Sequence, residues 1–87
     1  MEKHEKIAAY LTELENKGNM IDRSISKKIS GHLFELKVSD VRLLYYFGNN
    51  NHIVIVHALV KKRRNLDNAD IKLGERNRKD FIERFEI

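Results

Sequence analysis

The strongest constraint on the fold is a run of three segments in which apolar residues recur at every second position. The segments span residues 32–38, 41–47 and 52–62, and short polar stretches separate them at residues 39–40 and 48–51. A period of two is typical of strands, and polar stretches of this length connect neighbouring antiparallel strands. The sequence therefore predicts an antiparallel meander of three strands at the centre of the chain.

Helical periodicity flanks this meander on both sides. Residues 2–17 carry an apolar stripe at helical spacing, formed by Ile7, Leu11 and Leu14. A second, weaker stripe predicts a short helix over residues 21–30, formed by Ile21, Ile25 and Ile29. Asp67 or Asn68 can cap a last helix over residues 68–86. The order of elements predicts one α+β domain over residues 1–87, with a twisted antiparallel sheet of three strands, or four.

The pairing of the strands follows from the lengths of the turns. A two-residue turn at 39–40 places Val38 opposite Val41, and a four-residue turn at 48–51 places Phe47 opposite His52. One face is then almost wholly apolar, and the helices are expected to pack there. The residues of that face are Phe34, Leu36, Val38, Val41, Leu43, Tyr45, Phe47, Val54, Val56, Ala58 and Val60.

The opposite face gathers basic residues at one end of the sheet. In this register Lys37 lies opposite Arg42, and Arg42 lies opposite His57. Lys61 follows on the same face and begins a basic run with Lys62, Arg63 and Arg64. The last third of the chain, residues 61–87, holds nine basic and six acidic groups and so most of the net charge of +4. Such a cluster indicates a site for a phosphodiester anion.

Structural explanations of the same residues remain open. Arg42 can pair with Glu35, His57 can be a half-exposed strand residue, and the basic run can be a solvated turn. Tyr46 can stack on a base or simply pack against its neighbours.

Several classes of protein and of site are excluded or disfavoured. The chain has no cysteine, which excludes disulfides and thiolate catalysis and favours an intracellular, cytoplasmic protein. No segment approaches the ~20 apolar residues of a membrane span. The four histidines are scattered over the predicted elements, so we expect no metal site and no cofactor.

The order and spacing of the motifs resemble the RelE/ParE superfamily of toxins, and more narrowly its phage-derived, HigB-like branch. The matching residues are the segments LFELK at 33–37, VRLLYYF at 41–47 and IVIVHALVKK at 53–62, followed by ADIKLGER at 69–76. The resemblance covers about residues 5–85. Gly74 stands where the branch has alanine, which predicts a small residue packed against the sheet.

The resemblance implies the toxin of a type II toxin–antitoxin pair, which cleaves mRNA on the ribosome without a metal. By motif position it assigns Arg42 and Lys62 to transition-state stabilisation and His57 or Lys61 to proton transfer. Under this interpretation Arg63 and Arg64 bind mRNA or rRNA phosphates, and Lys37 and Tyr46 are candidate RNA contacts from their position on the same sheet face. The implied partners are the ribosome with its mRNA and an antitoxin carrying a helix-turn-helix domain.

Two departures from the family pattern leave other functions open. The chain begins after the family's usual first strand, which predicts an exposed sheet edge and a homodimer through it. Phe81 and Phe85 stand where a catalytic tyrosine would be sought. The alternatives are a ParE-like gyrase poison, which shares the fold, and a shortened, non-catalytic remnant that binds RNA or protein, which the short N-terminus suggests.

Overall fold

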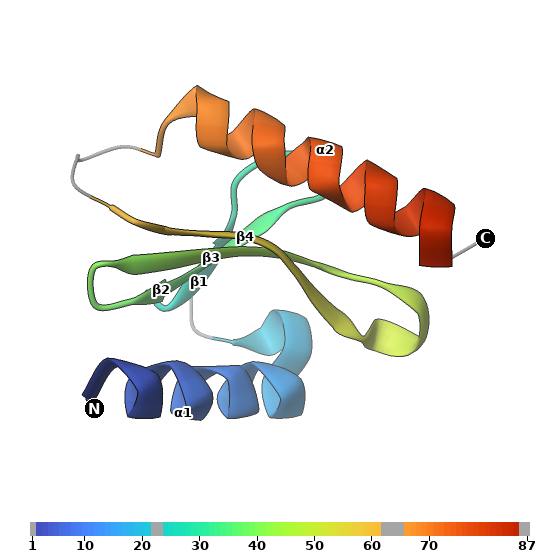
Figure 1. Cartoon of the computed structure of the whole chain (residues 1–87). Helices are drawn as coiled ribbons and strands as arrows, with labels where there is room; N and C mark the ends of the chain where they lie inside the picture. The colour runs from blue at the N-terminus through green and yellow to red at the C-terminus, as the bar shows by residue number, and fades with distance from the viewer. Residues whose placement is uncertain (1, 22–23, 62–65, 86–87) are drawn as a thin grey trace.

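The computed structural model describes residues 2–21, 24–61 and 66–85 and contains a four-stranded antiparallel sheet between two helices (Figure 1). The strand order follows the chain, β1-β2-β3-β4. Helix α1 covers one face of the sheet and helix α2 the other. The elements are α1 (Glu2–Lys17), η1 (Gly18–Met20), β1 (Ser26–Lys28), β2 (Phe34–Val38), β3 (Val41–Phe47), η2 (Asn49–Asn51), β4 (Ile53–Val60) and α2 (Asn68–Phe85).

Helix α1 forms where the sequence predicts it and carries its apolar stripe into the core. Leu14 is fully buried, and Ile7 and Leu11 pack around the same cluster. Gly18 ends the helix with φ of +55°, a left-handed conformation that glycine adopts without a steric penalty. The sheet contributes the rest of this core, namely Leu36, Val38, Leu43 and Tyr45.

The hairpin of β2 and β3 confirms the predicted register. Val38 pairs with Val41, and Lys37 pairs with Arg42. Ser39 takes a positive φ of 59° in the two-residue turn. The turn therefore sets the register, and every apolar residue of the two strands lies on the face expected for it.

The pairing of β3 with β4 differs from the prediction. Phe47 lies opposite Ile53 rather than His52, and Arg42 lies opposite Leu59 rather than His57. A β-bulge leaves Val56 as the extra residue, because Leu44 pairs with His57 and Tyr45 with Ile55. Because the turn before β4 is one residue longer than predicted, residues 53–55 lie on the faces opposite to those predicted for them, and Val54 and Val56 lie on the α2 side. The bulge then returns residues 57–60 to their predicted faces, and sequence periodicity alone cannot locate such an insertion.

The predicted helix over residues 21–30 is wrong where the structure describes it. Ser26–Lys28 form β1 and pair with β2, and the backbone N–H of Lys37 donates to the carbonyl of Ile25 at 2.7 Å. An isoleucine stripe at helical spacing is a weak signal over ten residues. Hydrogen bonding to the open edge of β2 outweighs that preference.

Helix α2 packs on the opposite face from α1, which corrects the expectation that the helices share one face. Gly74 makes this contact close: a Cβ atom there would lie 2.9 Å from Leu33 Cδ1 and 3.2 Å from Leu44 Cδ1. The predicted need for a small residue at position 74 is confirmed. Both faces of the sheet are covered, and within the described ranges no helix has the length and apolarity needed to cross a bilayer.

Tyr45 provides a test of this core. Its hydroxyl shares a 2.6 Å hydrogen bond with Ser26 Oγ, and burial raises the pKa of Tyr45 above its ordinary value although that hydrogen bond lowers it. Because a raised pKa means that the fold favours the neutral hydroxyl, Tyr45 contributes its full stabilisation below about pH 10. This contribution to the free energy of unfolding is lost as the pH rises further. We expect Tyr45→Phe to lower stability by about 1 kcal/mol at neutral pH and to flatten the alkaline loss. Urea unfolding between neutral and alkaline pH measures both, and an unchanged alkaline slope would contradict the assignment.

Candidate functional site

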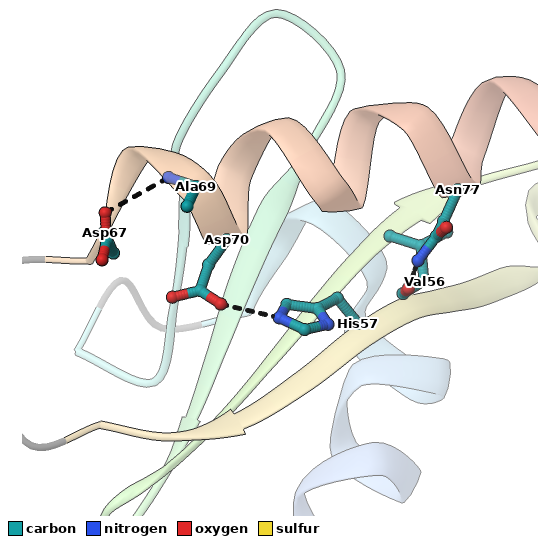
Figure 2. Close-up of polar contacts among 6 residues, drawn as sticks. All are labelled: Val56, His57, Asp67, Ala69, Asp70 and Asn77. Carbon is teal, nitrogen blue, oxygen red and sulfur yellow. Dashed lines mark hydrogen bonds and ion pairs between the residues drawn. The ribbon is translucent and has the colours of Figure 1, made fainter.

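His57 and Asp70 form an ion pair between β4 and the first turn of α2 (Figure 2). His57 Nε2 lies 2.9 Å from Asp70 Oδ1, and the side chains are 18% and 27% exposed. Asp67 positions the helix start, because its carboxylate accepts the backbone N–H of Ala69 at 3.2 Å. When Nε2–H donates to Asp70, the neutral ring leaves Nδ1 as a proton acceptor.

Arg42 lies beside a buried carboxylate. Its Nη1 donates to the carbonyls of Ser39 at 2.7 Å and Val41 at 3.0 Å, and its Nε lies 3.7 Å from Glu35 Oε2. The side chain of Glu35 is 1% exposed, and neither of its oxygens accepts a hydrogen bond from a described residue. The pairing of Arg42 with Glu35, left open by the sequence, is confirmed. The carboxylate of Glu35 therefore favours a positively charged side chain at position 42.

Basic side chains come together at the end of the sheet that holds the β2–β3 turn. Lys37 lies directly across from Arg42 on the neighbouring strand. Lys61 lies beside the turn, because its backbone N–H donates to the carbonyl of Asp40 at 2.7 Å. His57 remains on the same strand two residues from Leu59, the partner of Arg42. It is thus a diagonal neighbour of Arg42, at a typical separation of about 7–8 Å. Lys62, Arg63 and Arg64 lie outside the described residues.

Tyr46 occupies a different environment from the one expected for a base-stacking residue. It is 4% exposed, and Arg78 Cζ lies 5.5 Å from the centre of its ring. The guanidinium covers a ring face, so that face is not free to stack on a base. This contact joins β3 to α2 and leaves the packing interpretation of Tyr46 as the one that its surroundings favour.

Sequence reasoning missed Asp70. The spacing of residues 57 and 70 carries no sign of their contact, because it depends on α2 packing over the face that the prediction left open. The one available signal was an acidic residue in the first turn of a capped helix. Asn77 was also missed: its Nδ2 donates to the Val56 carbonyl at 2.7 Å and so joins α2 to the bulge (Figure 2).

The arrangement combines a proton-transfer group with fixed positive charge. His57 is oriented by Asp70, and Arg42, Lys37 and Lys61 occupy neighbouring positions at the end of the sheet that holds the β2–β3 turn. Such a set can bind a phosphodiester and move a proton at it. In the described part of the chain, no three histidine, aspartate or glutamate side chains lie close enough together to hold a metal ion.

The sequence matches one model of a known protein family. Residues 1–79 match the family model described as phage derived protein Gp49-like (DUF891). No curated protein and no solved structure matches the chain. The family is associated with toxins of toxin–antitoxin systems. The chain therefore belongs to the phage-derived Gp49-like family, within the RelE/toxin–antitoxin-like group.

Proposed function

We propose that the protein is the toxin of a type II toxin–antitoxin system and cleaves mRNA on the ribosome. The observation that carries the proposal is the His57–Asp70 pair lying on the same surface as Arg42 and its flanking lysines. Membership of the Gp49-like family supports the toxin assignment. The proposal includes a RelE-like fold of the HigB-like branch, a cytoplasmic site of action and neutralisation by a cognate helix-turn-helix antitoxin.

The proposed reaction uses the ribose 2′-hydroxyl as nucleophile. His57 Nδ1 accepts the 2′-hydroxyl proton, the 2′-oxygen bonds to phosphorus, and the bond from phosphorus to the 5′-oxygen breaks. The 5′-oxygen takes a proton from a neighbouring cationic group, and Lys61 is proposed for this role because its backbone lies beside the β2–β3 turn. Arg42 and Lys62 stabilise the negative charge on the phosphorane. Lys61 as the base, with His57 as the acid, is the converse assignment.

Phosphate contacts outside the reacting group complete the proposal. Lys37 lies across from Arg42 and is partly exposed, and its ammonium group is proposed to contact a neighbouring phosphate. Arg63 and Arg64 are proposed to bind mRNA or rRNA phosphates. Such contacts position the strand and make binding dependent on salt.

The test compares two histidines of the same chain. We expect His57→Ala to reduce mRNA cleavage by about 10²–10⁴-fold, because the variant loses the proton acceptor. His52→Ala serves as the control, since His52 is exposed beyond the start of β4. The readouts are growth after induction without antitoxin and primer extension on a translated mRNA.

The outcomes distinguish the proposed nuclease from the other functions. Growth arrest with intact transcripts would contradict cleavage and favour a gyrase poison. Normal growth with the wild-type chain at full expression would favour a non-catalytic remnant. Equal cleavage by the His57→Ala and wild-type chains would remove His57 from the mechanism.

The orienting role of Asp70 gives a separate prediction. Asp70→Asn keeps the size of the side chain but removes the charge that a protonated His57 would face at 2.9 Å. We expect cleavage to fall, but by less than in His57→Ala, because the amide oxygen can still accept the Nε2–H hydrogen bond while the charge that strengthens it is lost. Primer extension on a translated mRNA compares the two variants with the wild type. Equal cleavage by the Asp70→Asn and wild-type chains would show that the charge of Asp70 does not contribute to orienting His57.

A further inference from the structure

Strand β4 is a long sheet edge that lacks the usual protection. It stands last in the order β1-β2-β3-β4, spans eight residues, and contains no proline and no acidic or basic residue apart from His57. Natural proteins blunt exposed edges with short strands, lysines or proline. The opposite edge has two of these features, because β1 has three residues and two of them are exposed lysines. The β1 edge therefore carries features that oppose pairing with another strand, and β4 does not.

The backbone of β4 presents hydrogen-bonding groups along this edge. Lys61 N–H donates to the Asp40 carbonyl, so the alternation of an antiparallel ladder turns the peptide groups of Ala58 and Val60 away from β3. On the other side of the bulge, Gly48 N–H donates to the His52 carbonyl. The same alternation therefore turns the backbone N–H and C=O groups of Ile53 and Ile55 away from β3.

The side chains along this edge are apolar and exposed. Ile55 is 44% exposed and Val60 is 52% exposed, and both lie on the face of the sheet that carries α1. On the α2 side, a groove of about 300 Å³ runs between β4 and the end of α2, where Phe85 is 70% exposed. Main-chain groups and apolar side chains thus occur together, as strand addition requires.

We propose that a second copy of this chain pairs with β4 in antiparallel orientation, which makes one sheet continuous across a two-fold axis. An uncharged apolar strand is complementary to itself, and a two-fold axis brings the same patch together from both copies. The antiparallel direction also keeps the two copies of Lys61 at opposite ends of the interface, about 27 Å apart at ~3.4 Å per residue. That separation exceeds the ~8 Å screening length at physiological salt, so the net positive charge of the chain opposes pairing only weakly.

The size of the edge agrees with a dimer of modest affinity. The interface is as long as the strand, about 27 Å, and as high as the side-chain layers on the two faces of the sheet, about 10 Å each. These dimensions give roughly 540 Å² per copy, or about 1,000 Å² in total. This area lies at the lower limit of specific interfaces. The bulge and the bond from Asn77 to the Val56 carbonyl interrupt the edge at its middle, so pairing uses the segments on either side.

Sedimentation equilibrium of the full chain, from low micromolar to near-millimolar concentration, tests the proposal. We expect the wild type to associate to a dimer and Ile55→Lys to weaken association by about tenfold or more, since pairing would bury an unpaired charge. Met20→Lys is the matched control, because Met20 is 81% exposed and lies outside the sheet. Val60→Pro removes only an outward N–H and should also weaken the dimer while leaving the β3–β4 ladder intact.

Amide exchange at residues 55, 58 and 60 assigns the interface. Protection that rises with protein concentration at these amides, with Met20→Lys behaving as wild type, supports pairing through β4. A monomer at every concentration overturns the proposal, whatever other partner binds the edge. A dimer that Ile55→Lys and Val60→Pro leave unchanged overturns it as well, because association would then use another surface. The result is independent of nuclease activity, which sedimentation does not measure.

Discussion

Replacing Arg42 with alanine is expected to abolish mRNA cleavage and to destabilise the protein at the same time. The variant loses the proposed stabiliser of the phosphorane charge and leaves Glu35, 1% exposed, without the guanidinium that lies 3.7 Å away. Removing one partner of a buried ion pair usually costs about 3–5 kcal/mol. Chemical denaturation measures the loss of stability, and primer extension on translated mRNA measures the loss of cleavage.

A paired variant separates the two effects. Arg42→Met combined with Glu35→Met removes both charges and keeps apolar volume, and such replacements are often neutral for stability. We expect the double variant to recover most of the stability while remaining inactive. Cleavage by the stable double variant would remove Arg42 from the mechanism. Full stability of Arg42→Ala alone would show that Glu35 does not depend on this guanidinium.

Replacing Gly74 with leucine is expected to have the second large effect, because α2 then cannot approach the sheet. Even a Cβ atom would lie 2.9 Å from Leu33 Cδ1, and a leucine side chain would need space that Leu44 also occupies. Overpacking of this kind costs about 1–3 kcal/mol, and more where the backbone must move. The shift of α2 also separates Asp70 from His57, so both thermal stability and cleavage should fall.

Alanine at the same position gives a graded comparison. Gly74→Ala gains about 1 kcal/mol of helix propensity and displaces the ends of two flexible side chains, Leu33 and Leu44, so we expect little net change in stability. Gly31→Leu is the control for leucine substitution, because a Cβ atom at Gly31 meets nothing within 4 Å. Equal melting temperatures for the Gly74→Leu and wild-type chains would show that the contact between α2 and the sheet can relax without cost.

The predictable part of the site depends on local geometry. The two-residue turn between β2 and β3 determined that Lys37 lies across from Arg42, because strand pairing next to a tight turn leaves one register for the apolar residues. The contact between Arg42 and Glu35 was also predictable, since Glu35 lies on the same face of the sheet, two residues from Lys37. By contrast, the bulge at Val56 placed His57 opposite Leu44, and no pattern in β4 marks an inserted residue.

The sequence by itself determined the helices α1 and α2, the three long strands and the hairpin register. These features follow from turn length, from hydrophobic period and from capping, all of which act between near neighbours. The need for a small residue at position 74 was predicted from the resemblance to the toxin family. Only the tertiary structure decided that residues 26–28 form a fourth strand, that α2 covers the basic face, and that Asp70 meets His57. Those outcomes depend on which surfaces bury each other, and that choice is made between segments far apart in the chain.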